Sequence, residues 1–113
     1  MRALVTGGTG FVGANLEGRL VRDGHEVHLL VRPGHAAWRL DGMRADVSLH
    51  EVHEVELADT DALAAVVPRI RPEWVFHVAA HGAYAHQTDL ATIVRTNVLA
   101  TIALVEACLR AGF

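Results

Sequence analysis

The residues with the clearest chemical role are glycines near the N-terminus, in the segment TGGTGFVG at positions 6–13. Gly7, Gly10 and Gly13 fit the spacing G-x-x-G-x-x-G, and Gly8 with the last two also fits G-x-G-x-x-G. Glycines at this spacing permit a tight turn, let backbone N–H groups approach a pyrophosphate, and let a helix lie close to a strand. The segment therefore predicts a dinucleotide-binding loop between a strand and a helix. A glycine-rich turn without a ligand is the alternative.

Arg32 follows the predicted second strand, at the position that selects between two dinucleotides. An acidic residue at the end of this strand would bind the ribose 2′-hydroxyl of NAD, but the strand ends in Leu30-Val31-Arg32. A guanidinium group has the planar fork that suits a 2′-phosphate. The sequence therefore favours NADP, with NAD as the alternative cofactor, although an arginine after a strand is also common on protein surfaces.

Eight histidines raise the question of a metal site, and two pairs have suggestive spacing. His77 and His81 are four residues apart, but His77 ends a predicted strand, so the pair does not share a helix face. His50 and His53 lie in another predicted strand, where a separation of three residues places them on opposite faces. No cysteine pair or carboxylate triad joins these histidines. We therefore expect no metal site.

His81 and Tyr84 follow the predicted fourth strand and are candidates for contact with a substrate. Ligands of open parallel sheets bind outside the carboxyl ends of the strands, which is where this segment begins. Solvent-exposed loop residues without a ligand are the alternative interpretation.

The elements that position these residues alternate between strands and helices. Short apolar runs bounded by turn residues predict strands at 3–5, 26–31, 50–56 and 74–78. Helical spacing predicts helices at 11–22, 59–67 and 89–111, with a short helix around 36–40. This alternation is typical of an α/β fold, a Rossmann-type doubly wound parallel sheet with helices on both faces. We expect one domain over residues 1–113, with about four strands in the order 3-2-1-4.

Composition and charge argue against several classes of protein. The chain has 113 residues, a formal net charge of −3 and no cluster of basic residues, so a nucleic-acid surface is not expected. The uninterrupted apolar stretches are much shorter than the roughly 20 residues that span a bilayer, and no signal peptide is visible. Cys108 is the single cysteine, so no internal disulfide forms and a reducing compartment fits. We therefore expect a cytoplasmic protein without nucleic-acid or membrane partners.

Three segments together resemble a known family, namely TGGTGFVG at 6–13, HVAA at 77–80 and TNVLAT at 96–101. They are similar to the extended short-chain dehydrogenase/reductase family, and within it to the NAD(P)-dependent nucleotide-sugar epimerases, dehydratases and reductases. The resemblance covers all 113 residues and corresponds to the N-terminal third of such an enzyme. It implies an enzyme that acts on a nucleotide-linked sugar through transient hydride transfer. A non-catalytic NAD(P)-binding sensor or regulator, and an atypical reductase of a small carbonyl compound, are the alternatives.

The resemblance also implies roles for individual residues. Glu56 and Leu57 take the place of an Asp–hydrophobic pair that contacts the adenine, and glutamate is a departure there. Ala79 and Ala80 would pass beneath the cofactor ribose, where side chains must be small. Asn97 would support the active site by organising water and backbone. The implied cofactor contacts are Gly7, Gly10, Phe11, Val12, Gly13, Arg32, Glu56, Leu57, Ala79 and Ala80.

The catalytic pair of the resembled family is missing from this sequence. That pair is Tyr-x-x-x-Lys, in which the tyrosine is the acid/base and the lysine activates it and holds the nicotinamide ribose. The single tyrosine, Tyr84, is followed by Gln87 and Thr88, and no lysine occurs. We therefore expect no catalytic residue within these 113 residues, which would form a dinucleotide-binding domain truncated before the catalytic segment.

Two surfaces of the predicted fold favour self-association. The strand at 74–78 would form an edge that has no charge, proline or bulge to protect it from pairing with another chain. The helix at 89–111 has apolar residues over an arc wider than about 100°, which is more than one sheet face requires. In the resembled family, the excess apolar surface packs on a second subunit within a four-helix bundle. We therefore expect a homodimer formed through this helix.

Overall fold

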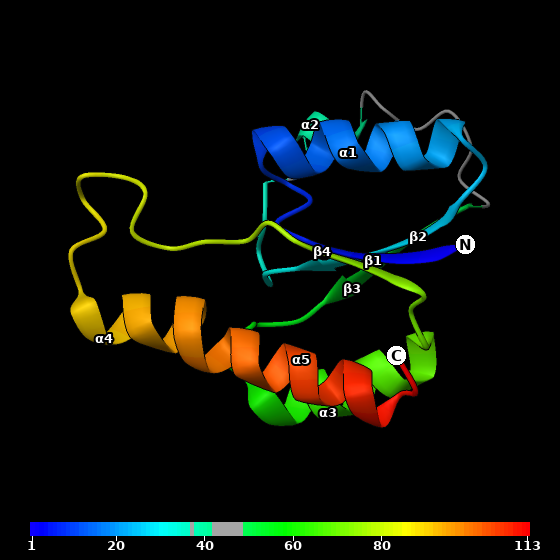
Figure 1. Cartoon of the computed structure of the whole chain (residues 1–113). Coiled ribbons are helices and arrows are strands. Elements are labelled where there is room, and N and C mark those ends of the chain that lie inside the picture. Colours follow the sequence, from blue (N-terminus) through cyan, green and yellow to red (C-terminus); the bar gives the residue numbers. More distant parts are fainter. Residues whose placement is uncertain (37, 42–48) are drawn as a thin grey trace.

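Four parallel strands form a sheet between two helical layers (Figure 1). The computed structural model describes residues 1–36, 38–41 and 49–113. The strands are β1 (Arg2–Thr6), β2 (Glu26–Val31), β3 (His50–Glu54) and β4 (Trp74–His77), in the order β3-β2-β1-β4. Helices α1 (Phe11–Arg22) and α2 (Trp38–Asp41) cover one face of the sheet, and α3 (Thr60–Ile70) and α5 (Ala100–Arg110) cover the other. The Rossmann-type sheet and the strand order predicted from the sequence are thus confirmed.

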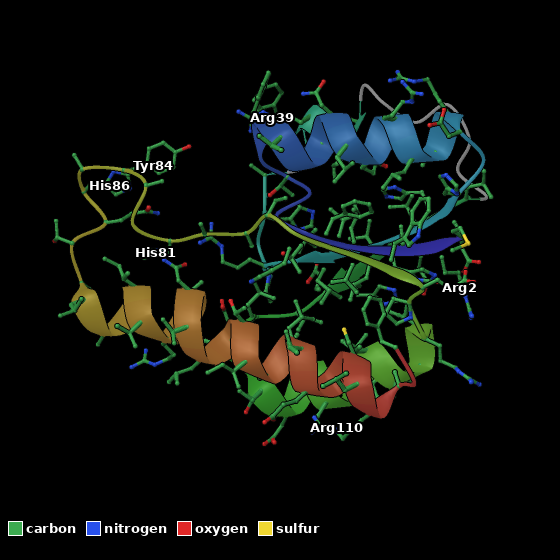
Figure 2. All side chains as sticks on the ribbon, in the orientation of Figure 1. Arg2, Arg39, His81, Tyr84, His86 and Arg110 are labelled. Carbon is green, nitrogen blue, oxygen red and sulfur yellow. The ribbon has the colours of Figure 1, made fainter. Side chains whose placement is uncertain are left out.

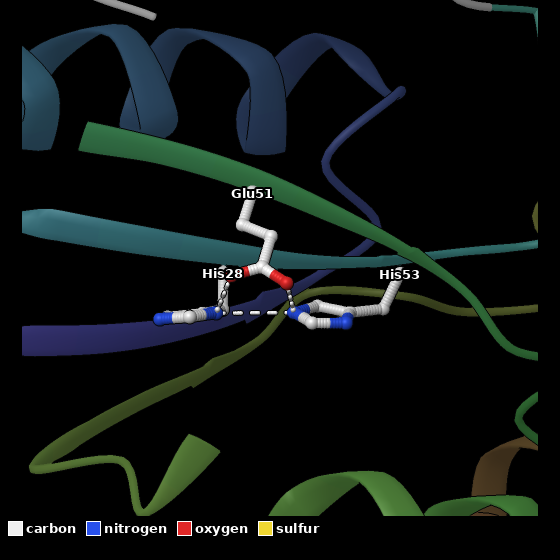
Figure 3. A group of neighbouring side chains, drawn as sticks. All are labelled: His28, Glu51 and His53. Atoms are coloured by element: carbon white, nitrogen blue, oxygen red, sulfur yellow. Dashed lines mark hydrogen bonds and ion pairs between the residues drawn. The ribbon is translucent and has the colours of Figure 1, made fainter. Parts of the chain in front are cut away.

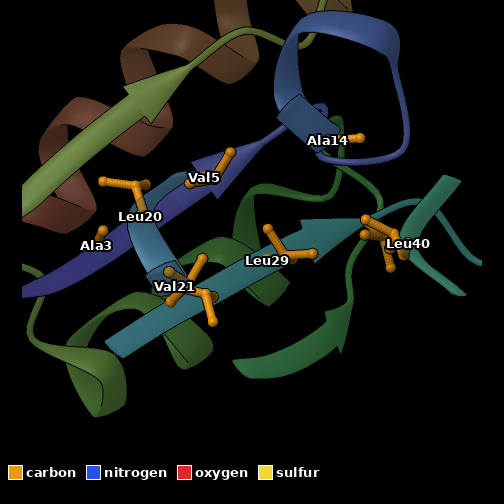
Figure 4. Packing of buried hydrophobic residues seen from close by; sticks show 9 residues of the cluster. Ala3, Val5, Ala14, Leu20, Val21, Leu29 and Leu40 are labelled. Carbon is orange, nitrogen blue, oxygen red and sulfur yellow. The ribbon is translucent and has the colours of Figure 1, made fainter. Parts of the chain in front are cut away.

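Two hydrophobic clusters join the layers, because alternate residues of a strand point to opposite faces. Ala3 and Val5 of β1 face α1 and form one cluster with Ala14 and Leu20 (Figure 4). Leu4, between them in the chain, belongs to the other cluster, with residues of α3 and α5. β2 is buried over nearly its whole length, as expected for a strand covered on both faces. β4 is only partly buried, because it is the edge strand of the described sheet, as the sequence predicts.

Helix α3 starts as predicted but ends later. The Asp59 side chain accepts a hydrogen bond from the backbone N–H of Ala62 at 3.0 Å, so Asp59 is the N-cap. The helix then continues through Pro68 to Ile70, where the sequence predicts an end near residue 67. Pro68 lacks the N–H that would bond to the carbonyl four residues earlier, but it lies in the last turn and only two helical residues follow it. Arg71, in a left-handed conformation with φ of 52°, ends it instead.

Three other predicted elements differ in detail from those observed. The short helix predicted around 36–40 is found as α2, and residue 37 lies outside the described residues. The strand predicted at 50–56 ends at Glu54, although the N–H of Val55 still donates to the carbonyl of Val31 at 2.8 Å. The helix predicted at 89–111 is one run of α4 (Leu90–Val94), a π-helical turn η2 (Arg95–Leu99) and α5.

The run from α4 to α5 has two apolar faces, of which only one is covered in the described structure. Leu104, Ala107 and Cys108 are buried with α3 beneath the sheet. The run Leu90–Arg110 is long and apolar enough to cross a membrane by length and composition, but the core helix of a soluble protein passes the same test. The second face, here named the apolar stripe, consists of residues that are 41–70% exposed: Leu90, Val94, Val98, Ile102, Val105 and Leu109. Its arc confirms that the helix is apolar on more than one side.

The loop between β1 and α1 is closed by backbone packed directly on backbone. A Cβ atom on Gly13 would lie 2.1 Å from the carbonyl oxygen of Gly7, far inside van der Waals contact. The same carbonyl accepts a hydrogen bond from the N–H of Gly10 at 3.0 Å, so it is fixed in place. The first turn of α1 therefore rests on the loop only because residue 13 has no side chain.

We expect Gly13→Ala to lower the free energy of unfolding by about 1–3 kcal/mol, the usual cost of forcing extra atoms into a packed site. Helix propensity alone predicts the opposite sign, a gain of roughly 0.5–1 kcal/mol for alanine over glycine. Urea unfolding followed by circular dichroism measures the difference. The matched control is Gly10→Ala, whose Cβ would lie 3.3 Å from the Gly7 oxygen, and we expect a smaller loss. A Gly13→Ala chain as stable as the parent would contradict this packing.

We also expect the chain to self-associate through the apolar stripe. The double variant Ile102→Glu/Val105→Glu places charge at two exposed stripe positions and should shift sedimentation toward the monomer. Arg22→Glu, on an exposed part of α1, changes the net charge equally and should leave the association unchanged. A parent chain that sediments as a single monomeric species would contradict self-association through the apolar stripe.

Candidate functional site

The loops that follow β1 and β4 meet at the carboxyl edge of the sheet. β1 and β4 pair in parallel, with Thr6 opposite His77. A Cβ atom on Gly7 would lie 2.7 Å from the backbone N of Ala79, and Gly7 has a positive φ of 71°. Only glycine meets both conditions at this position. The structure thus brings together two of the segments predicted to bind the cofactor.

The N-terminus of α1 is free to bind an anion. Its N-cap, Gly10, makes no side-chain cap, and the first turn contains no acidic residue. The side chains of Phe11 and Val12 are 75% and 63% exposed, so they leave the turn open to solvent. The backbone N–H groups of a first helical turn have no partner within the helix. This open and uncapped turn, next to the contact of Gly7 with Ala79, fits a pyrophosphate.

Thr6, His77 and Thr101 form a hydrogen-bonded chain from β1 across β4 to α5. The Thr6 hydroxyl accepts a hydrogen bond from the N–H of Ala79 at 3.2 Å and meets Nδ1 of His77 at 2.6 Å. On the other side, Nε2 of His77 lies 2.9 Å from the Thr101 hydroxyl. That hydroxyl donates to the carbonyl of Asn97 at 2.7 Å, so it accepts from His77. His77 therefore carries its proton on Nε2 and accepts from Thr6 through Nδ1.

His77 is suited to act as an uncharged hydrogen-bonding residue that holds β1 and α5 in place. Burial lowers its pKa below the usual histidine value, which favours the uncharged ring that this hydrogen-bonded chain requires. Sequence spacing considers His77 only as a metal ligand and overlooks Thr6 and Thr101. The available signal was a polar residue, Thr6 or His77, at the end of each of two adjacent strands, where a buried or partly buried polar group needs a partner.

Asn97 holds the backbone of the loop after β4. Its Oδ1 accepts from the N–H of His81 at 2.9 Å, and its Nδ2 donates to the carbonyl of His81 at 2.7 Å. Asn97 lies in η2, and π-helical turns occur often at functional sites. The backbone part of the role predicted for Asn97 is visible in these two bonds. Its contribution to an active site stays a prediction.

Two arginines lie beyond the glycine loop, where the adenosine of a dinucleotide would extend. Arg32 follows β2 directly and is exposed. Arg39 of α2 donates through Nη1 to the carbonyl of Thr9 at 3.1 Å, and its guanidinium lies over the ring of Trp38 at 4.2 Å from the centroid. Sequence reasoning missed Arg39, because no local pattern indicates that α2 folds back onto the loop. A pair of cations near this end of the site suits a phosphate.

Glu56 and Leu57 are placed differently from each other. Glu56 is exposed, and its Oε1 accepts from the N–H of Ala58 at 3.3 Å, so the carboxylate is directed at its own loop. Leu57 is partly buried and packs against the hydrophobic cluster on the α3 side. Their predicted contacts with adenine remain predictions.

The candidate substrate residues lie in the segment between β4 and α4, which reaches away from the sheet (Figure 2). Tyr84 is 67% exposed and stacks on His86, with ring centroids 5.7 Å apart. His81 lies closer to the sheet and is held through its backbone (Figure 2). The structure therefore does not bring Tyr84 against the glycine loop, and both substrate contacts stay predictions.

The histidines considered in the sequence have different partners in the structure. The His50 side chain contacts Glu17 on the α1 face of the sheet, and His53 lies on the opposite face beside His28. The His77 ring is held by Thr6 and Thr101, as described above. His50 and His53 therefore point away from each other, as their spacing in the strand predicts. The neighbour of His53 comes from another strand, which spacing within one strand does not reveal.

Comparison with known proteins agrees with this geometry. Residues 3–113 match the model of the NAD dependent epimerase/dehydratase family. The chain is 35% identical to UDP-glucose 4-epimerase of Mycolicibacterium smegmatis, over 99% of this chain and 36% of that protein. It is 33% identical to a putative dihydroflavonol 4-reductase of Synechocystis, over 96% of this chain and 29% of that protein. The crystal structure of Bordetella bronchiseptica WbmG in complex with NAD and UDP superimposes with a TM-score of 0.82 and 30% identity, covering 99% of this chain and 34% of that one.

The chain spans about a third of the length of these relatives. The match nevertheless includes the glycine loop, all four strands and the helical run of α4 to α5. The chain therefore belongs to the NAD dependent epimerase/dehydratase family, in the nucleotide-sugar branch of the extended short-chain dehydrogenases/reductases.

Proposed function

We propose that this chain is the NAD(P)-binding segment of an enzyme that epimerises, dehydrates or reduces a nucleotide-linked sugar. The observation that carries the proposal is the open N-terminus of α1 beside the contact of Gly7 with Ala79. The relatives named above include a UDP-glucose 4-epimerase and the enzyme WbmG, whose structure is in complex with NAD and UDP. Relatives of this kind favour an enzyme over a non-catalytic sensor.

Each part of the site has a task in this function. The backbone N–H groups of Phe11, Val12 and Gly13 bind the pyrophosphate at the positive end of the α1 dipole. Ala79 and Ala80 keep the floor beneath the ribose free of large side chains. A bound nicotinamide supplies transient hydride transfer. The residues of this chain hold and orient it and do no acid/base chemistry themselves.

We propose NADP as the preferred cofactor, with NAD as the alternative. The family is NAD-dependent by description, and the WbmG structure contains NAD. The preference for NADP rests on this chain's own residues, since β2 ends in the exposed Arg32 and not in an acid. Arg39, held at the Thr9 carbonyl, adds a second cation near the same end.

The substrate and assembly of the whole protein follow from the same assignment. We propose a nucleotide-sugar substrate, with a small carbonyl compound as the second choice, contacted by His81 and Tyr84. Residues 1–113 would be a dinucleotide-binding domain that lies before the catalytic segment. The protein would be cytoplasmic, without nucleic-acid or membrane partners, and homodimeric through the exposed apolar stripe.

We expect NADPH to bind more tightly than NADH by about tenfold or more, since a charge-assisted contact contributes roughly 1.5–3 kcal/mol. Calorimetric titration of the chain with each cofactor measures the ratio. Arg32→Ala should remove most of the preference, and Arg22→Ala, an exposed arginine at the other end of α1, should retain it. Equal affinities would contradict the NADP preference alone. Failure of both cofactors to bind would contradict the proposed function.

We expect the 113-residue chain by itself to show no epimerase, dehydratase or carbonyl reductase activity. General acid/base catalysis is worth about 10²–10⁴-fold, and the single tyrosine has no lysine partner. Steady-state assays with UDP-glucose, dTDP-glucose and a small aldehyde test this. Turnover that disappears in Tyr84→Phe would show that Tyr84 has taken over the acid/base role.

A further inference from the structure

Three potential metal ligands from β2 and β3 converge on the face of the sheet opposite α1. The two strands pair in parallel with His28 opposite Glu51 and with Leu30 opposite His53. Residues two apart in a strand share a face, so the three side chains project to the side that Leu30 shares with α3. Figure 3 shows the Glu51 carboxylate above the two imidazole rings, with one nitrogen of each ring turned toward the other.

The distances between the ligand atoms suit a small divalent cation. Nδ1 of His28 lies 3.0 Å from Nε2 of His53. Oε2 of Glu51 lies 3.6 Å from Nδ1 of His28, and Oε1 of Glu51 lies 3.7 Å from Nε2 of His53. Around a tetrahedral zinc with bonds of about 2.0–2.1 Å, ligand atoms are about 3.3 Å apart. Small movements of side chains would therefore place all three at bonding distance from one ion.

A second carboxylate prepares His28 to bind a metal. Nε2 of His28 lies 2.7 Å from Oε1 of Glu26, on the same face of β2. A carboxylate only accepts hydrogen bonds, so the His28 proton is on Nε2 and Nδ1 presents its lone pair to His53 and Glu51. Metal-bound histidines usually donate their other N–H to a carboxylate in this way.

Without an ion, the Glu51 carboxylate makes no normal hydrogen bond to either histidine. With the lone pair of His28 Nδ1 facing His53, the proton between the rings must come from Nε2 of His53. The Glu51 oxygens are then too far from either nitrogen for a normal hydrogen bond. A cation at the centre of the triangle satisfies all three groups at once, with the His53 proton on Nδ1 so that Nε2 is free to bind the ion.

Burial and charge also suit a metal site. The side chains of His28 and His53 are 7% and 18% exposed, whereas Glu51 is 64% exposed. The carboxylate side therefore gives an ion a path in and leaves a position for a water ligand.

We propose that His28, Glu51 and His53 bind one zinc ion, or a similar divalent ion that prefers imidazole ligands, with water completing the coordination. The ion would tie the outer strand β3 to β2. The sequence predicts no metal site, because it compares only histidines that are close together in the chain, whereas this site joins residues of two strands. It lies in the middle of β2 and β3 and away from the glycine loop, so the proposal does not depend on the proposed function.

The test is a titration of the tag-free, chelator-treated chain with Co²⁺, followed by visible absorption, and then with Zn²⁺ in competition. We expect one ion per chain with the absorption of four-coordinate cobalt, and a melting temperature that rises with zinc. His53→Gln and Glu51→Gln should each weaken binding at least about tenfold, and Glu26→Gln should weaken it by about 10–100-fold through His28. His86→Gln and Glu54→Gln, both exposed, are the controls and should bind like the parent.

Two results would overturn the proposal. One is the absence of a one-to-one site in the folded parent chain at micromolar cobalt and zinc. The other is parental affinity in both His53→Gln and Glu51→Gln, which would assign the binding to other histidines. Glu51 is exposed, so its variant should keep the fold even if a change at His53 does not, and circular dichroism checks each variant. Titration of the same samples with NADPH measures cofactor binding separately, so that a failure of metal binding is distinguished from a failure of the cofactor proposal.

Discussion

The contact of backbone with backbone around Gly7 is the constraint on which the site depends. Its carbonyl supports the first turn of α1 at Gly13, and its α-carbon lies against the backbone of Ala79. A side chain at Gly7 or Gly13 would push the helix or the β4 loop away. The same contacts leave the N-terminus of α1 open beside the carboxyl edge of the sheet. The free backbone N–H groups of such a helix end bind a pyrophosphate.

Hydrogen bonds then fix the second wall of the site relative to the first. The chain through Thr6, His77 and Thr101 links β1, β4 and α5 in one direction of donation. Asn97 continues it by holding both backbone groups of His81. Because these groups are partly buried, each lost partner would leave a polar atom unsatisfied. The loop after β4 is therefore positioned by the helical run as well as by the sheet.

The two faces of the sheet differ in how polar groups are accommodated. On the α1 side, the buried Glu17 meets His50. On the α3 side, His28 of β2 and His53 of the outer strand β3 lie beside Glu51, while Leu4 and Leu30 are buried on the same face. Two features of the described chain are therefore suited to binding: the polar cluster of His28, Glu51 and His53 to an ion, and the exposed apolar stripe on α4 to α5 to another protein surface.

The sequence alone determined the architecture, because strand and helix periodicity and the glycine spacing are local properties. It also indicated the family, through three motifs whose spacing is preserved along the chain. It did not reveal Arg39 at the Thr9 carbonyl, the chain through His77, or the meeting of His28 with His53. These depend on the register between strands and on the path of α2, which arise only when distant segments pack together. Local pattern states what each residue is able to do, whereas tertiary structure decides which residues do it together.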